Sequence, residues 1–561
     1  MVAQCLRLIS YRPRWQLDPS SLKGRDDAMA AAENLTLITN ARICDGTGTP
    51  IFDGQVLIAG ERIAEVLPAD VPAPRADQIL DAGKRILAPG FIDVHSHSDL
   101  TALAMPESES KITQGITTEI VGNCGESAFP LSQRLREEFA RSYADLGIEF
   151  AWRDAHEYFD QLERARPTVN VASFVGHGNV RASVMGFEDR PPTADELKAM
   201  KQEVEKAIDA GAWGLSTGLI YPPGMFAPTE ELVELTRTAA RHGGMMASHI
   251  RGEGDRLLEA AREFLDIARA AEAPSQFSHL KASGPRNWGK VAQVIEWIEE
   301  HNRLGPLVRF DRYPYTASST DLSSLLPPWV LDGGRERALE RLADAATRQR
   351  IRHEMETDYG PEAPWDRILI ASIHAEEYRH FGGHSIAEIA EAKGMDPLDT
   401  FFAMLTASEL NATICSFTMS EADMDLVLTH PWCMVCTDAR SLGAKFAETY
   451  VPHPRGFGAF PRFLQRFVRE KHLLSLEEAV RKMTSLAADT FGLHERGRIA
   501  PYYFADLVLF DPETVSDNSE FGRPPKLASG ISHVFVNGVL TVAEGRLTGQ
   551  RAGRVLRRKN S

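Results

Sequence analysis

The two ends of the chain share one hydrophobic pattern. Short runs of alternating apolar and polar residues, bounded by Gly or Asp, lie at 36–39, 55–59 and 62–66, and again at 505–511, 533–537 and 539–542. This alternation predicts short antiparallel strands, with a tight turn at Asn537-Gly538. We therefore expect residues 35–87 and 497–550 to build one small β-sandwich domain to which both ends of the chain contribute.

The middle of the chain, residues 88–496, has a different pattern. Amphipathic segments begin at Thr193, where Glu196 completes a capping box, at Thr229 and at about Asp255. They alternate with apolar runs at 87–97, 118–124, 171–177, 212–218, 245–249, 275–279, 308–313 and 432–438. Eight strands that alternate with helices, without a Rossmann glycine signature, predict an α/β fold of the (β/α)8 type, a TIM-like barrel.

Two segments fall outside this scheme. The stretch from about 316 to 384 is too long for an ordinary connection and predicts an insertion over the active face. Its strand-like run at 367–374 leaves open whether part of it joins the barrel. Residues 1–34 are expected to be a disordered leader, or an upstream mis-start before Met29. Arg and Pro interrupt the apolar residues there, which argues against a secretory signal.

Composition narrows the class of partner. A formal net charge of -16 argues against nucleic acid or an anionic membrane surface, and no apolar run approaches a transmembrane length. Six cysteines are spread thinly along the chain and form no disulfide framework, so we expect a reducing, cytoplasmic location. We expect a small-molecule substrate and a monomer or small homo-oligomer.

Residues that bind metals gather at the predicted strand ends. His95 and His97 alternate along one strand with Asp93, so the three side chains share a face. Further candidate ligands end other strands, where barrel enzymes carry their chemistry: Cys124, His249, His279 and Asp438. Four imidazoles, a thiolate and a carboxylate suit zinc, and they can hold two ions if one ligand bridges. The carboxylate can also serve as a proton shuttle.

Other residues of the same types have alternative interpretations. His177 ends a strand within Gly-His-Gly-Asn, a setting that allows either a functional role or a part in shaping the turn. Cys433 and Cys436 have metal-like spacing, but along a strand their side chains face opposite sides, so we expect both in the core.

With these motifs the chain resembles the amidohydrolase superfamily and, within it, the N-acyl-D-amino-acid deacylase (D-aminoacylase) family. The resemblance covers nearly everything from about 35 to 545. It rests on the segments 89–97, 112–118, 121–125, 176–181, 214–224, 248–251, 278–281, 436–439 and 453–455. Gly-Asn-Cys-Gly at 122–125 is the most specific part, because most relatives in the superfamily place lysine or glutamate where Cys124 lies.

The resemblance implies roles for these residues. Cys124, His249 and His279 would hold a tightly bound zinc ion. His95 and His97, with Cys124 and Asp438, would form a second, weaker site, and Asp438 would be the general acid/base. The substrate's α-carboxylate would be held by Tyr221, Lys281, Tyr313 or Tyr315, Ser318 or Ser319, and Arg455.

The implied activity is zinc-dependent hydrolysis of N-acyl-D-amino acids to a carboxylate and a free D-amino acid. Zinc lowers the pKa of a bound water from ~15.7 toward ~7, and Asp438 can take its proton. The alternatives are a relative acting on another amide (a cyclic imide or ureide, a dipeptide, an N-acyl-L-amino acid or an aryl analogue) and a scaffold without catalysis. The loop 439–454 is longer than the family pattern predicts, and its Arg440 and Lys445 raise the hypothesis of acidic side chains on the substrate.

Overall fold

Both ends of the chain meet in one sheet in the computed structural model, which describes residues 34–360, 363–443 and 451–558. The nine strands are β1 (Leu35–Ile43), β2 (Phe52–Ala59), β3 (Arg62–Pro68), β4 (Gln78–Asp81), β5 (Ile86–Pro89), β18 (Leu507–Phe510), β19 (Ile531–Val536), β20 (Val539–Ala543) and β21 (Arg546–Leu547). The antiparallel pair β5–β18 joins the two ends. The predicted leader lies almost entirely outside the described residues.

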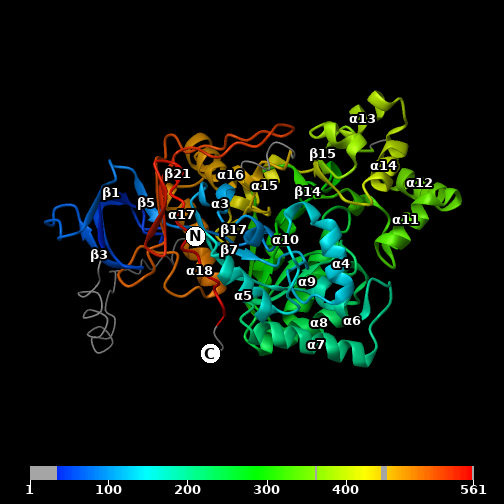
Figure 1. Cartoon of the computed structure of the whole chain (residues 1–561), viewed down its shortest axis with the longest axis horizontal. Coiled ribbons are helices and arrows are strands. Elements are labelled where there is room, and N and C mark those ends of the chain that lie inside the picture. Colours follow the sequence, from blue (N-terminus) through cyan, green and yellow to red (C-terminus); the bar gives the residue numbers. More distant parts are fainter. Residues whose placement is uncertain (1–33, 361–362, 444–450, 559–561) are drawn as a thin grey trace, which may run out of the picture.

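The nine-stranded sheet folds back on itself around its own apolar core. The turn between β2 and β3 approaches the C-terminal part of the chain, where the Ala505 amide donates to the Glu61 carbonyl and the Ile63 amide to the Tyr503 carbonyl. Apolar side chains from these strands are buried inside the folded sheet and form its core. They include Ile38, Val56, Ile58, Leu507 and Leu509. This satellite domain lies at the left of Figure 1, in blue and red.

The central domain is a barrel of parallel strands. Its strands are β6 (Phe91–Asp93), β7 (Ile116–Val121), β8 (Asn170–Ser173) continued by β9 (Val175–Gly176), β10 (Gly214–Gly218), β11 (Met245–His249), β12 (Ser275–Phe277), β13 (Val308–Arg312) and β17 (Cys433–Val435). Every pairing among them is parallel. The Asp438 amide donates to the His95 carbonyl over 2.8 Å, which closes the ring between β17 and β6. The (β/α)8 fold predicted from the sequence is therefore confirmed.

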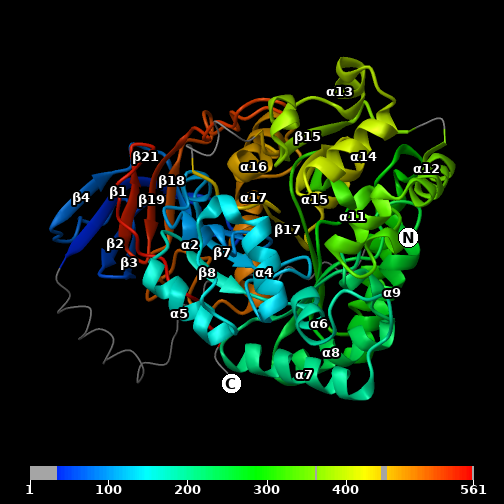
Figure 2. The ribbon, with the colours of Figure 1, turned by 45° about the vertical axis from the view of Figure 1, so that its right-hand side comes forward.

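Helices surround this barrel, with α7 and α8 on its outer side in both ribbon views (Figures 1 and 2). Thr193 and Glu196 form the predicted capping box at the start of α7. The helices of the central domain are α2 (Thr101–Ala104), α3 (Glu109–Ile112), α4 (Gln133–Ser142), α5 (Ala155–Ala165), α6 (His177–Met185), α7 (Ala194–Asp209), α8 (Thr229–Arg241), α9 (Leu257–Ala271), α10 (Lys290–His301), α15 (Glu421–Thr429), α16 (Arg455–Phe463), α17 (Leu476–Met483) and α18 (Ser485–Phe491).

A separate subdomain lies between β13 and β17, at the right of Figure 1. It contains an antiparallel sheet of β14 (Ser318–Asp321), β16 (Ala412–Ser416) and β15 (Ile368–Ile373), with helices α11 (Arg335–Ala343), α12 (Ala345–Tyr359), α13 (Ile386–Lys393) and α14 (Pro397–Ala407). The strand-like run at 367–374 thus belongs to this sheet. The subdomain has its own apolar core and extends to Ser416, beyond the predicted end near 384, because β16 completes its sheet.

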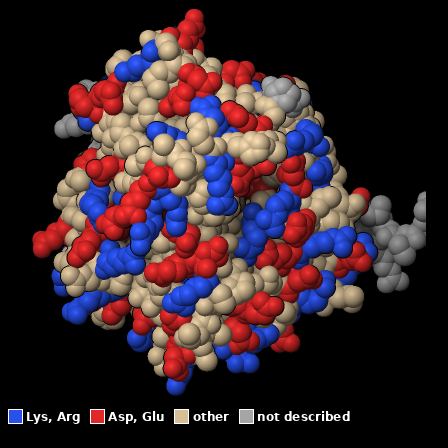
Figure 3. Space-filling model, turned by 90° about the vertical axis from the view of Figure 1, so that its right-hand side faces the viewer, with Lys and Arg blue, Asp and Glu red and all other residues tan. Residues whose placement is uncertain are grey.

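The outer surface carries charges of both signs. On the face that Figure 3 presents, lysine and arginine are interspersed with aspartate and glutamate. Within the described part of the chain, no helix combines the length and the apolar character needed to cross a bilayer.

Candidate metal centre and substrate site

Five barrel strands bring the predicted ligands to one edge of the barrel. Each ligand lies at the end of its strand or just beyond it. His95 and His97 follow β6, Cys124 follows β7, His249 ends β11, His279 follows β12 and Asp438 follows β17. Cys124, His279 and Asp438 have φ angles of 52°, 37° and 49°. Residues other than glycine seldom adopt this left-handed conformation, and three of the candidate ligands adopt it here.

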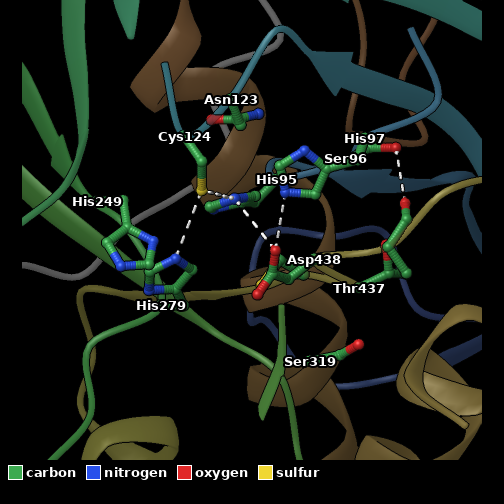
Figure 4. Close-up of polar contacts among 12 residues, drawn as sticks. His95, Ser96, His97, Asn123, Cys124, His249, His279, Ser319, Thr437 and Asp438 are labelled. Carbon is green, nitrogen blue, oxygen red and sulfur yellow. Dashed lines mark hydrogen bonds and ion pairs between the residues drawn. The ribbon is translucent and has the colours of Figure 1, made fainter. Parts of the chain in front are cut away.

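Four of these side chains form a tight, buried group. The ligating atoms of His95, Cys124, His279 and Asp438 lie within 4.8 Å of one another. The Cys124 sulfur lies 3.2 Å from His95 Nε2 and 3.5 Å from His279 Nε2. His95 Nε2 also lies 3.4 Å from Asp438 Oδ1. Figure 4 shows the sulfur between the imidazoles, so nitrogen, sulfur and oxygen donors converge on a common region.

The charges in this group suit metal binding. Burial raises the pKa of Cys124, but the neighbouring imidazoles outweigh it and hold the pKa well below the ordinary 9.0. Burial likewise raises the pKa of Asp438, and the Arg455 guanidinium and the histidines lower it further than burial raises it. The thiolate and the carboxylate are the forms in which these side chains bind metal ions.

A second group shares His279 and includes Glu253, which the sequence analysis missed. The ligating atoms of His249, Glu253 and His279 again lie within 4.8 Å of one another. Neither ring nitrogen of His249 has a hydrogen-bond partner among the described residues, although both are buried. Because an unpartnered buried polar atom is costly, His249 fits the role of a metal ligand.

The donor set as a whole fits zinc. Imidazole nitrogen, thiolate sulfur and carboxylate oxygen are the ligands that zinc takes in proteins. His97 lies at the edge of the group, with its side chain 26% exposed and its Nε2 3.0 Å from Asp438 Oδ1.

Asp311 supports the group from β13 and was also missed. Its fully buried carboxylate lies 3.3 Å from His95 Nδ1 and accepts the backbone N–H of His279 over 3.0 Å and the thiol of Cys436 over 3.1 Å. A carboxylate on the outer nitrogen of a metal-binding imidazole fixes the orientation of that ring. The strand reads Val-Arg-Phe-Asp-Arg, so its aspartate is one charged residue among three, and no local signal in the sequence sets it apart.

Asp93 does not join the ligands, although it precedes His95 on the same strand. Its carboxylate instead accepts the Lys111 ammonium over 2.8 Å and the Thr437 amide over 2.9 Å. Lys111 is fully buried and also lies 2.8 Å from Glu119. This buried network ties β6 and β7 to the segment that carries Asp438.

Arg455 joins the metal group to the predicted substrate site. It begins α16 and donates from Nη1 to Asp438 Oδ2 over 2.7 Å and from Nη2 to the Ser319 carbonyl over 3.2 Å. Its guanidinium lies over the Tyr313 ring, 4.5 Å from the centroid. Arg455 Nε and the Tyr313 hydroxyl are both buried without a hydrogen-bond partner among the described residues. Two such donors close together can serve an anionic ligand.

The other predicted substrate residues have partners within the protein. The Tyr315 hydroxyl donates to Asp517 over 2.9 Å, and the Tyr221 hydroxyl lies 2.9 Å from Thr320 Oγ1. Lys281 Nζ lies 2.5 Å from Glu253 and 2.8 Å from His279 Nδ1.

Both predicted serines lie in β14, where their main chains pair with β16: Ser318 opposite Ser416 and Ser319 opposite Cys415. Ser319 lies below Asp438 in Figure 4, and its backbone carbonyl accepts the hydrogen bond from Arg455.

His177 and the two strand cysteines belong to the framework. His177 Nε2 lies 2.8 Å from Glu231, which also pairs with Arg181, and this buried cluster joins α6 to α8. Cys433 and Cys436 are fully buried in the core, as predicted.

A parallel (β/α)8 barrel with nitrogen, sulfur and carboxylate donors at its strand ends defines a metal-dependent barrel enzyme. The sequence matches the Amidohydrolase family over residues 78–546. It is 39% identical to the N-acyl-D-glutamate deacylase of Alcaligenes xylosoxydans xylosoxydans over 525 residues, which cover 94% of this chain and 97% of the relative. It is 34% identical to the D-aminoacylase of the same organism over 526 residues, or 93% and 97% of the two chains.

A solved structure agrees with these sequence relatives. The zinc and phosphonate-inhibitor complex of N-acyl-D-glutamate deacylase from Bordetella bronchiseptica is 36% identical, with a TM-score of 0.79, over 94% of this chain and all of that one. The chain therefore belongs to the Amidohydrolase family, within the group that includes D-aminoacylase and N-acyl-D-glutamate deacylase.

Proposed function

We propose that this protein is a zinc-dependent deacylase that hydrolyses the amide bond of N-acyl-D-amino acids, giving a carboxylate and a free D-amino acid. The observation that carries the proposal is the contact between two sites. Arg455 bonds to Asp438 at the metal group and, with Tyr313, presents buried donors that lack protein partners. A substrate whose carboxylate binds there has its neighbouring amide bond close to the metal group.

The metal roles in this proposal are those that the family resemblance implies. In this proposal Cys124, His249 and His279 hold the tightly bound zinc ion, and His95 and His97, with Cys124 and Asp438, form a weaker second site. When bound, zinc supplies Lewis-acid polarisation of the amide carbonyl and acidifies water.

Asp438 moves the proton. Its Oδ1 lies 3.0 Å from His97 Nε2, and its Oδ2 is held by Arg455, so the carboxylate has a fixed orientation within the metal group. An ionised carboxylate in this position accepts a proton from the attacking water and later donates it to the leaving nitrogen. Arg455, through its unpartnered Nε and its positive charge, and Tyr313, through its hydroxyl, bind and orient the α-carboxylate.

An amidohydrolase acting on another amide is the second candidate. A cyclic imide or ureide has no free α-carboxylate. The buried donors of Arg455 and Tyr313 favour a substrate that has such a carboxylate, and therefore disfavour the cyclic amides. A scaffold without catalysis is disfavoured, because such proteins typically lose ligands, and every ligand position here is filled.

The test is amine release by the zinc-loaded protein from paired N-acetyl-D- and N-acetyl-L-amino acids with neutral, aromatic and acidic side chains. We expect turnover of the D forms only, lost in Asp438→Asn with zinc still bound. Turnover of L forms, or silence on both enantiomers with stoichiometric zinc, would rule the proposal out in favour of other amides. Silence without zinc binding would favour the scaffold.

A further inference from the structure

The connection between β18 and β19 is far longer than its strands need. The two strands pair antiparallel in the satellite sheet, and such neighbours are usually joined by about two to five residues. Here the connection runs from 511 to 530. The backbones of Ser516 and Ser529 pair at its base over 3.0 and 3.1 Å. We call residues 516–529 the arm.

The arm reaches from the satellite domain to the barrel and the inserted subdomain. Both ribbon views show this red segment crossing toward β15 (Figures 1 and 2). Gly383 of the subdomain packs so closely that an added Cβ would meet the Gly522 carbonyl at 2.9 Å. The Asp517 amide and the Ser516 hydroxyl both bond to Gln465, beyond the end of α16. The arm thus contacts both other parts of the molecule.

Asp517 holds the tyrosine next to the substrate site. Its side chain is only 2% exposed and accepts the Tyr315 hydroxyl over 2.9 Å, with Arg462 3.7 Å away. A Cβ on Gly458 of α16 would collide with this carboxylate, so the glycine provides the space in which Asp517 lies. Tyr315 in turn packs edge-on against His453, with ring centroids 5.1 Å apart.

Phe521, near the tip, packs against the same histidine and also edge-on against Tyr315, with ring centroids 6.1 Å apart. Its ring lies 4.7 Å from His453 and 4.7 Å from Phe417, between centroids. His453 Nε2 donates to the Ala317 carbonyl over 2.9 Å, and its Nδ1 accepts the backbone N–H of Arg455 over 3.0 Å. The arm therefore fixes His453, and His453 fixes the start of α16, where Arg455 lies.

We propose that the arm is a positioning element of the substrate site: Phe521 and Asp517 hold His453 and Tyr315, and so keep the Arg455 guanidinium where a substrate carboxylate can bind. The role in substrate binding rests on the proposed function. Both are positioning residues in this proposal, because they act through His453 and Tyr315.

The kinetic test compares Phe521→Ala with wild type. The matched control is Glu520→Ala, which changes the adjacent, exposed residue. In Phe521→Ala we expect KM for the N-acyl-amino acid to rise at least about tenfold because the change loosens the carboxylate grip, with a smaller fall in kcat through the Arg455–Asp438 bond and with zinc content unchanged. Phe521→Tyr, which keeps the ring, and Glu520→Ala should both resemble wild type. An unchanged KM, or a fall in kcat alone, would overturn the proposal.

A second measurement separates this inference from the proposed function. Hydrogen exchange of the peptide that covers 453–458 should be faster in Phe521→Ala and in Asp517→Asn than in wild type or Glu520→Ala, with or without a substrate. If the wild type hydrolyses no N-acyl-amino acid but this difference appears, the proposed function fails while the positioning of Arg455 by the arm is supported. Equal exchange in all four proteins would overturn the positioning itself.

Discussion

Which nitrogen of an imidazole faces the metal group is decided by the carboxylate behind it. His95 directs Nε2 toward Cys124 and Nδ1 toward Asp311. His279 likewise directs Nε2 toward Cys124 and Nδ1 toward Glu253. The Asp311 carboxylate favours a proton on His95 Nδ1, which leaves His95 Nε2 as a lone-pair donor. His279 Nδ1, in contrast, faces both Glu253 and the Lys281 ammonium, 2.8 Å away. At the residue scale, the site therefore depends on Asp311 and Glu253 as well as on the ligands.

Asp311→Asn tests this dependence. The amide is neutral and can turn its NH2 group toward His95, so we expect zinc affinity to fall by about 10- to 100-fold. The measurement is competitive zinc titration with a chromophoric chelator. Asp423→Asn is the control, because Asp423 is also buried but caps Gly289 away from the metal group. Equal affinity in all three proteins would contradict a role for Asp311.

Arg440 tests the hypothesis of acidic substrates. It lies two residues beyond Asp438, with its guanidinium 4.9 Å from the centre of the Tyr143 ring and bonded to that hydroxyl over 3.2 Å. If it also recognises a side-chain carboxylate, Arg440→Ala should lower kcat/KM for acidic N-acetyl-D-amino acids about tenfold or more and leave neutral ones nearly unchanged. Arg141→Ala, an exposed arginine on α4, controls for the loss of charge. Equal losses on both substrate classes would exclude the selective role. Lys445, the other basic residue of this loop, lies outside the described residues.

At the scale of elements, local signals in the sequence were sufficient wherever a local cause fixes the structure. The capping box at Thr193 and the short strands β1 and β2 depend on neighbours in sequence, and both were predicted. The boundary of the inserted subdomain depends on β16 pairing with β14 and β15. No local pattern reveals such a distant partner, so the predicted end fell short of Ser416.

α17 contains a lysine whose charge is unfavourable in the folded state. Lys482 is fully buried and donates a hydrogen bond to the His430 carbonyl. Burial lowers the pKa of its ammonium from the ordinary 10.5 to about 8. Between these values the unfolded chain keeps the proton and the folded protein does not. The unfolding free energy of wild type relative to Lys482→Met should therefore rise with pH from about 8 to 10.5, by about 3 kcal/mol at most.

Urea denaturation of both proteins across this pH range is the measurement. Lys471→Met is the control: the pKa shift of Lys471 has the opposite sign and acts only above pH 10.5, so this difference should stay nearly flat across the range. Partial burial lowers the pKa of Lys471, but Asp425 and Glu421 raise it further, so its contribution to stability is lost as pH rises through its folded pKa. A flat difference for Lys482→Met would show that the folded protein keeps that lysine charged.

At the scale of the whole molecule, the metal group joins strands that are distant in sequence. Its candidate ligands come from β6, β7, β11, β12 and β17. Their residue types and strand-end positions were readable from the sequence, because each lies where an apolar run stops. The supports were not, since Asp311, Glu253 and the Arg455–Tyr313 contact depend on how separate strands and α16 meet in space.

Removal of zinc should therefore destabilise the entire barrel. An ion that binds only the folded state at a thousand times its Kd adds about 4 kcal/mol to the unfolding free energy. Treatment with 1,10-phenanthroline, followed by dialysis, should lower the Tm, and zinc but not magnesium should restore it. Calorimetry combined with metal analysis measures both quantities. An unchanged Tm in protein shown to be metal-free would mean that the ligand strands are held by packing alone.

The pairing of β5 with β18 also has a consequence for how the protein is made. Leu87 pairs with Leu509, and Gly90 alone separates β5 from β6, the strand that leads to His95 and His97. The ribosome releases Leu87 long before Leu509 exists. One edge of β5, the strand that precedes the first two histidines, therefore stays unpaired until translation is nearly complete. A nascent chain stalled before β18 would expose that edge, which makes it a natural substrate for chaperones.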